Sequence, residues 1–199
     1  MKEIRKLDMQ FRAVEDTDKM EIKGYAVVFN SPETYGYTEV ISEKALDNAD
    51  MSDVVLRYNH NDTFMVLART RNKSLNLNVD EKGLFMDATL QNDITEHRNI
   101  YNAIKSGLID KQSFAFTIDE DEYDYDTDTR TITKIGKLYD VSVVDQPFYN
   151  ATDVSLASKN DDFMERRAEL RKEHEEQIEK EKQEEELRKL KDEVLAKLG

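Results

Sequence analysis

The chain has 199 residues, 38% of them hydrophobic, which is enough for one ordinary domain with an appendage. Its 43 acidic and 29 basic residues give a net charge of -14, which argues against broad binding to nucleic acid. It has no cysteine, which excludes disulfides, thiolate metal sites and a cysteine nucleophile. No stretch resembles a secretory signal or reaches the ~20 apolar residues that cross a bilayer. We therefore expect neither a nucleic-acid partner nor a membrane partner.

The first half of the chain is typical of short strands separated by turns. A hairpin is expected from strands at 7–14 and 20–29, with the polar residues 15–19 as its turn. A short turn of helix is expected near Ser42, a plausible helix cap. Further strands are expected at 38–41, 53–60, 64–69, 74–79 and 84–90. This pattern favours a mainly β fold.

His60 lies at the end of the expected strand 53–60. In an extended strand it shares a face with Val54, Leu56 and Tyr58, so packing holds it next to the loop that follows. Such a position suits a catalytic base that is fixed yet reaches a cleft. It also suits a structural histidine that only makes hydrogen bonds, and the residues alone leave both interpretations open.

Ser113 lies between a turn and a strongly apolar strand, in the stretch GLIDKQSFAF from Gly107. A helix is expected before it, over 95–106, with Gly107 as its stop and with His97 on a solvated face. Alternation along the strand turns Phe114 and Phe116 into a core and leaves Ser113 on the other face. An ordinary serine at a strand edge is the competing interpretation.

Asp140 is a polar group presented by the last expected strand, 136–144. It shares a face with Ser142 and Val144, while Val141 and Val143 lie on the opposite face. The acidic run 119–128 before this strand lacks the glycine and the closing glutamate of a calcium loop, so a solvated hairpin tip is expected.

About eight strands with one or two helices predict a β-barrel or a sandwich, and we favour the barrel. Residues 150–158 are expected to form its irregular exit. After it the composition changes to a charged tail without proline, rich in glutamate and lysine four residues apart, which predicts a long helix. The expected organisation is a domain at 1–158 and a helical tail at 159–199, the last three turns of which offer a leucine-rich face to a partner.

Several short motifs, in this order, resemble one protein family. They are Gly24-Tyr25-Ala26 with Phe29-Asn30, Glu39-Val40-Ile41 with Ala45, Asn59-His60, Gly83-Leu84, Gly107 with Ser113-Phe114-Ala115-Phe116, and Asp140-Val141-Ser142-Val143-Val144 with Pro147. Over roughly residues 8–157 they are similar to the prohead, or capsid maturation, proteases of tailed bacteriophages. Those are serine proteases related in fold to the herpesvirus assemblins, so the resemblance implies an assemblin-like β-barrel with a few flanking helices.

The resemblance also implies roles for three residues. Ser113 would be the nucleophile, His60 the general base, and Asp140 the acid that orients the imidazole, with Asp145 as a competitor for the third position. The oxyanion donors stay open between backbone amides and an arginine such as Arg130. The family often has an acidic residue directly after the histidine, where this chain has Asn61.

The function implied is a serine endopeptidase that cuts scaffold or capsid-protein segments, and its own tail, inside the assembling prohead in the host cytoplasm. The partners are the major capsid protein and scaffold segments, no cofactor or metal is expected, and a homo-oligomer is left open. The alternative is a non-catalytic assembly or scaffolding protein that binds through its helical tail. A carbohydrate- or metal-binding β-domain has only scattered carboxylates in its favour.

Overall fold

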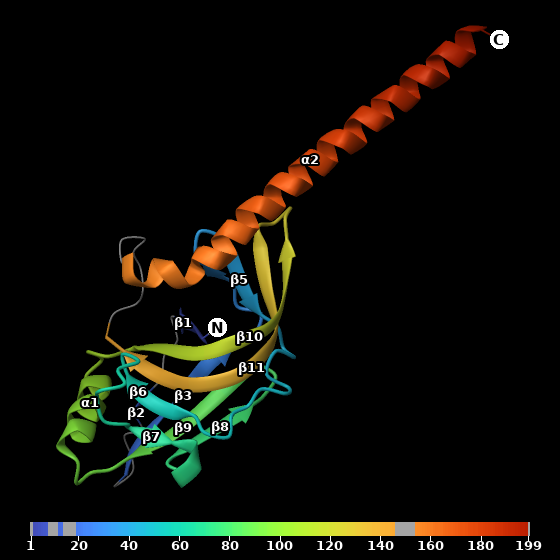
Figure 1. Cartoon of the computed structure of the whole chain (residues 1–199). Helices are drawn as coiled ribbons and strands as arrows, with labels where there is room; N and C mark the ends of the chain where they lie inside the picture. Colours follow the sequence, from blue (N-terminus) through green and yellow to red (C-terminus); the bar gives the residue numbers. More distant parts are fainter. Residues whose placement is uncertain (1, 8–11, 14–18, 146–153, 199) are drawn as a thin grey trace. The chain divides into compact units, whose positions relative to one another are not determined.

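A computed structural model describes residues 2–7, 12–13, 19–145 and 154–198 of the chain (Figure 1). Contacts divide the chain into two compact units, Met1–Tyr149 and Asn150–Gly199, whereas the sequence-based boundary lies at 158/159. The first unit contains all the described strands, and the described part of the second is one long helix.

The larger of two sheets holds seven of the described strands. They are β1 (Lys2–Leu7), β4 (Glu33–Thr34), β5 (Thr38–Ile41), β6 (Val55–Tyr58), β7 (Ala68–Arg69), β10 (Lys111–Asp124) and β11 (Thr129–Val144). Their order is β1-β10-β11-β5-β4, and β6 joins the far end of β11 and pairs with β7. The hairpin of β10 and β11 is the centre of this sheet, because β5 and β6 both run parallel to β11 along different parts of its length.

The smaller sheet has the order β2-β3-β9-β8. Its strands are β2 (Arg12–Ala13), β3 (Met20–Val28), β8 (Leu75–Val79) and β9 (Gly83–Leu90). A short 3-10 helix, η1 (Thr70–Asn72), precedes β8, and helix α1 (Thr95–Lys105) follows β9. Among the described strands, hydrogen bonding closes neither sheet into a ring, so the chain is mainly β but the expected barrel, and with it an assemblin-like fold, is not confirmed.

The hydrophobic core joins both sheets and α1. Phe114 and Phe116 of β10 have no exposed surface, and their rings stack with centroids 4.9 Å apart. Ile22 and Met86 of the smaller sheet and Ile104 of α1 belong to the same cluster. The alternation of the sequence explains this packing, because β10 turns every second side chain toward this core.

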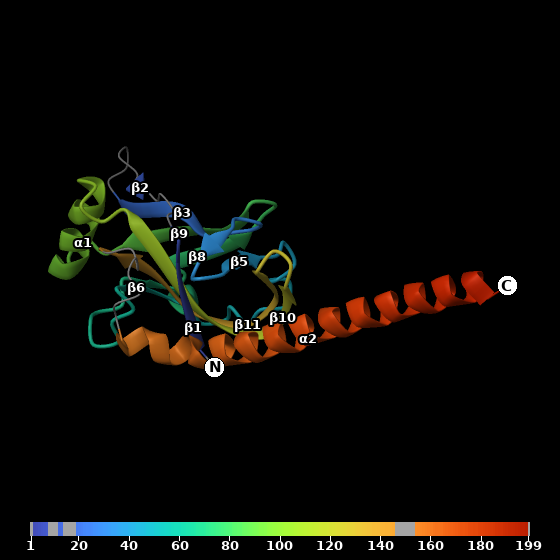
Figure 2. The ribbon, with the colours of Figure 1, turned by 90° about the horizontal axis from the view of Figure 1, so that it is seen from above.

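The N-terminal strands differ from the expected hairpin. Arg12 and Ala13 do pair with β3, but much of the expected turn lies outside the described residues. The preceding segment, Lys2–Leu7, forms β1 in the other sheet, antiparallel to β10 (Figure 2). This pairing links residues more than one hundred positions apart, so no local pattern indicates it.

Three other segments differ from expectation. The acidic residues 119–124 belong to β10 rather than to the hairpin tip, because cross-strand partners such as Lys134, which pairs with Glu120, hold them extended. The stretch 43–48 forms turns rather than helix. His97, expected on a solvated face, is buried: its Nδ1 accepts the Gln91 amide at 3.0 Å, and its Nε2 lies 3.1 Å from the Val66 carbonyl oxygen.

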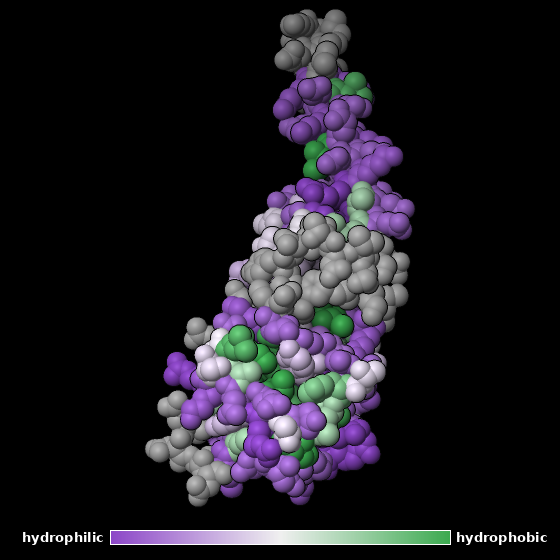
Figure 3. Space-filling model, turned by 90° about the vertical axis from the view of Figure 1, so that its left-hand side faces the viewer, coloured by the Kyte–Doolittle hydropathy of each residue, from purple (hydrophilic) through white to green (hydrophobic). Residues whose placement is uncertain are grey.

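The tail forms helix α2 (Val154–Leu198). The expected irregular exit is wrong for residues 154–158, which are already helical and include the good helix formers Leu156 and Ala157. The described side chains of α2 are mostly exposed and hydrophilic (Figure 3), and Glu185 and Lys189 form an ion pair one turn apart. No helix among the described residues is both long and apolar enough to span a membrane.

Candidate active site

Ser113 lies near the start of β10. Helix α1 ends at Lys105, and Gly107 then adopts a φ of 75°, a left-handed conformation that reverses the chain at little cost to glycine. Ser113 pairs with Ser142 of β11 on one side and with Lys6 of β1 on the other. The side chain has no exposed surface. Flanking strands therefore fix the position of this hydroxyl.

His60 lies in a tight turn directly after β6. The expected strand 53–60 ends at Tyr58, and Asn59 and His60 both have a φ of 53°. Two backbone hydrogen bonds support this turn, from Asn59 to the Val143 carbonyl and from Asn61 to the Tyr58 carbonyl, each 3.0 Å long. Left-handed conformations at two successive non-glycine residues cost roughly 1–3 kcal/mol each and persist where the surrounding structure enforces them.

The strand β11 brings Asp140 to the same place. Its Oδ1 lies 2.5 Å from Nδ1 of His60, whose Nε2 lies 2.5 Å from Oγ of Ser113. The three side chains that the sequence singled out, separated by 53 and 80 residues along the chain, thus form one continuous hydrogen-bonded series. Asp145 lies elsewhere: its Oδ2 accepts a 2.7 Å hydrogen bond from the Tyr58 hydroxyl.

Ser142 is a fourth member that the sequence analysis did not assign. Its Oγ donates to Oδ1 of Asp140 at 2.9 Å and lies 3.1 Å from Nδ1 of His60. The side chain is fully buried. The signal was present in the sequence, because residues i and i+2 of a strand share a face, so a hydroxyl at 142 had to lie beside the carboxylate at 140.

The environment keeps Asp140 ionised. Burial by itself raises the pKa of this carboxyl, since only 1% of the side chain is exposed. The hydrogen bond with His60 and the electrostatic attraction to its ring, the ammonium of Lys2 at 3.2 Å and the hydroxyl of Ser142 outweigh that effect and lower the pKa of Asp140 below its ordinary value. An anionic carboxylate next to Nδ1 favours a proton on that nitrogen and leaves Nε2 to accept the serine proton.

Arg130, one candidate for an oxyanion donor, is paired with carboxylates. Its Nε lies 2.6 Å from Asp121, and its guanidinium also approaches Glu39 at 3.4 Å. Glu39 is buried together with Arg5 in the same cluster, and the hydroxyl of Tyr37 donates to it as well. Burial raises the pKa of the Tyr37 phenol to about 12. This arrangement commits Arg130 to a buried ion-pair network.

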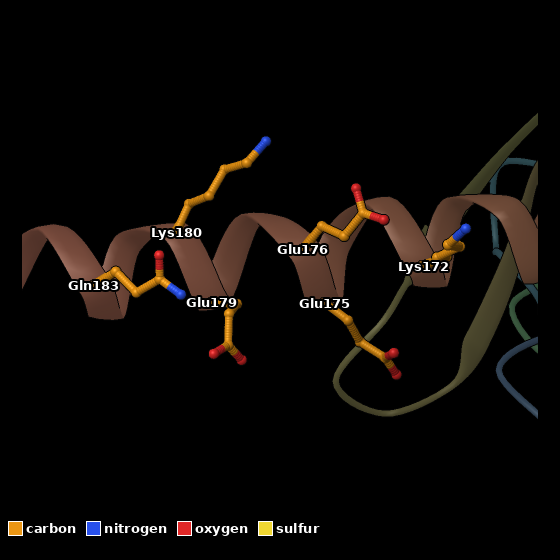
Figure 4. A pocket seen from close by; sticks show the side chains of 6 residues that line it. All are labelled: Lys172, Glu175, Glu176, Glu179, Lys180 and Gln183. Atoms are coloured by element: carbon orange, nitrogen blue, oxygen red, sulfur yellow. The ribbon is translucent and has the colours of Figure 1, made fainter.

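Other parts of the described chain offer weaker sites. No group of three or more histidine or acidic side chains in the described residues is arranged to hold a metal ion. A hollow on α2 is bordered only by polar side chains of that helix, which project from it along its length (Figure 4). They are Lys172, Glu175, Glu176, Glu179, Lys180 and Gln183. With a single helix as its wall, this hollow is open surface.

A serine hydroxyl, an imidazole and a carboxylate in series define the class of serine hydrolases, in which the same geometry recurs on unrelated folds. The comparison with known families agrees with this class: the family described as caudovirus prohead serine protease matches residues 7–167. The chain therefore belongs to the prohead serine protease family. No curated protein and no solved structure is significantly similar to it.

Proposed function

We propose that this chain is a serine endopeptidase that cuts scaffold or capsid-protein segments inside an assembling prohead, with Ser113 as nucleophile, His60 as general base and Asp140 as the residue that orients the imidazole. The observation that carries the proposal is the hydrogen-bonded series from Ser113 Oγ through His60 to Asp140, in a chain of this family.

The chemistry follows from the positions of the atoms. His60 Nε2 takes the proton of Ser113 as Oγ attacks the carbonyl carbon of the scissile peptide bond. The imidazolium then gives that proton to the leaving amine, and the C–N bond breaks to leave an acyl-serine. Water, deprotonated by the same imidazole, releases the acid and restores the hydroxyl. Asp140 holds Nδ1–H and stabilises the transient positive charge on the ring.

The test is intact mass spectrometry of the chain co-expressed with the capsid protein encoded beside it. Wild type is expected to trim the capsid protein and its own tail, and Ser113→Ala should leave both whole. Ser106→Ala is a matched control, because that hydroxyl is exposed and bonds only to its own helix end at Ala103 in the described contacts. Intact shells from uncleaved protein in every sample would favour a scaffolding role instead.

The tail has a separate place in the proposal. Helix α2 would carry the protease into the shell by pairing with helical scaffold segments, since its exposed charges and isolated apolar side chains, Ile178 and Leu187, suit a partner helix better than a core. Deleting residues 161–199 should leave the enzyme active but poorly packaged. Unchanged incorporation into procapsids would show that the tail has no such role.

A further inference from the structure

Strand β1 runs along the edge of β10 that carries Ser113. All six of its residues pair with β10 in antiparallel register, from Lys2 opposite Thr117 to Leu7 opposite Gln112. Lys6 lies directly opposite Ser113. The backbone beside the nucleophile is therefore already hydrogen-bonded to another segment of the same chain, and the Ser113 side chain is fully buried.

The main chain of β1 also binds the nucleophile itself. Oγ of Ser113 donates to the carbonyl oxygen of Arg5 at 2.8 Å. A serine hydroxyl has one proton to donate, so the Arg5 carbonyl competes for it with Nε2 of His60, 2.5 Å from the same Oγ. A hydroxyl bonded to the carbonyl is not poised to give its proton to the imidazole, which general-base catalysis requires.

A second contact from β1 reaches the carboxylate. Nζ of Lys2 lies 3.2 Å from Oδ2 of Asp140. This cation compensates part of the negative charge with which Asp140 would stabilise an imidazolium. Strand β1 thus contacts both Ser113 and Asp140.

The side chain of Arg5 holds the strand in place. Its Nε and Nη2 form a two-pronged ion pair with Glu39, the second bond measuring 2.8 Å, and Nη1 bonds to Glu3 at 2.8 Å. The guanidinium also lies over the ring of Phe116, 5.9 Å from its centroid, and only 5% of Arg5 is exposed. Planar two-pronged pairing of this kind is specific as well as strong, so it acts as a latch for β1.

We propose that β1 is an autoinhibitory strand, which occupies the edge of β10 where an extended segment of substrate pairs and which must leave before cleavage begins. The proposal rests on the proposed protease function. A vacated edge of β10 offers unpaired N–H and C=O groups beside Ser113, and strand addition to such an edge is a recurrent way of binding peptides. The competing occupant is then a stretch of capsid or scaffold protein in extended conformation.

The experiment measures the rate at which a fluorophosphonate reacts with Ser113, followed by intact mass. In this reaction an Oγ–P bond forms as the P–F bond breaks, the hydroxyl proton passes to His60, and fluoride leaves. Arg5→Met removes the latch but keeps an unbranched apolar side chain, while Arg130 and Tyr37 still neutralise or bond Glu39. The variant should react about tenfold faster than wild type or more. Arg69→Met, which breaks a two-pronged ion pair between β7 and Asp53, is the matched control and should react at the wild-type rate.

A second variant gives an answer even if Arg5→Met fails to fold. Lys2→Cys combined with Thr117→Cys joins two opposed positions of β1 and β10, and the chain has no other cysteine to interfere. Opposed residues of antiparallel strands are about 4.5–5.5 Å apart at Cα, which a disulfide spans. The oxidised form should react about tenfold more slowly than the reduced form of the same protein, or slower still.

The possible failures are distinct. Equal rates for the oxidised and reduced forms, and for Arg5→Met and wild type, would show that β1 does not block the nucleophile, while the protease function would stand. Absence of any label at Ser113 in every form, with the strand released or locked, would refute the protease function and with it this inference.

Discussion

The hydroxyl of Ser142 offers a sharp test of how the site is held together. Its 2.9 Å hydrogen bond ends on Oδ1 of Asp140, the same oxygen that contacts Nδ1 of His60. Removing it in Ser142→Ala leaves a buried carboxylate with one partner fewer and an imidazole with less support. We therefore expect the reaction at Ser113 to slow, although Ser142 itself touches no reacting atom.

The magnitude follows from the type of bond. A hydrogen bond to a charged group contributes roughly 1.5–3 kcal/mol, more than one between neutral groups. If the whole of that is lost when the imidazolium forms, the rate falls about 10- to 150-fold, at roughly 1.4 kcal/mol for each factor of ten. A fall much larger than this range would indicate misfolding, which circular dichroism would detect.

The assay is the rate of fluorophosphonate reaction at Ser113, which needs no knowledge of the cleavage site. Ser142→Thr retains a hydroxyl and should recover most of the lost rate, whereas Ser106→Ala, at an exposed position, should change nothing. A Ser142→Ala protein that reacts within about twofold of wild type would refute the idea that this hydroxyl positions the pair.

The remaining predictions concern stability. Because the pKa of Asp140 is lowered in the folded state, its stabilising effect is complete above the ordinary carboxyl value of about 3.9 and is lost as the pH falls through the lowered pKa. The urea midpoint should therefore fall more between pH 7 and pH 3 in wild type than in Asp140→Asn. Equal falls in the two proteins would contradict this. Gly83→Ala should destabilise by more than about 2 kcal/mol, since its Cβ would lie 2.0 Å from the Val27 carbonyl oxygen, while Gly36→Ala, with open space around it, should cost only about 1 kcal/mol; similar urea midpoints for the two would argue against the clash. His97→Ala should lower the free energy of unfolding by about 1–3 kcal/mol by leaving two backbone groups without their buried partner, yet leave the rate at Ser113 unchanged, and a large loss of rate in a folded protein would point to a role in the site.

The elements that the sequence predicted well are those with a local signal. Strand β9 (Gly83–Leu90) begins one residue before the strand expected at 84–90, and α1 ends two residues before its expected stop at Gly107. The residues of the candidate site were also accessible, since strand alternation and the family resemblance together singled out Ser113, His60 and Asp140. What local patterns could not give is the turn at Asn59–His60, because its left-handed geometry depends on the neighbouring strand β11.

The features that were missed depend on distant parts of the chain. The charged sequence of β1 is not typical of a strand, and the buried partner Glu39, more than thirty residues away, compensates the charge of Arg5 in the core. His97 is similar, since its flanking charges indicate a solvated face while the Val66 and Gln91 backbone groups that bury it come from other segments. The partners that bury Arg5 and His97 are brought to them only by the tertiary structure.

The parallel pairing of β6 with β11 has a consequence for the newborn protein. Val55 lies opposite Asp140 in that register, and Asn59, in the turn that presents His60, donates to the Val143 carbonyl, so this turn lacks its support from β11 until that strand exists. Synthesis proceeds from the N-terminus at about 5–20 residues per second, and contacts between distant segments form late. His60 and Ser113 therefore leave the ribosome seconds before the strand that lies between β6 and β10, and a partly made chain contains both residues but cannot yet hold them in the proposed arrangement.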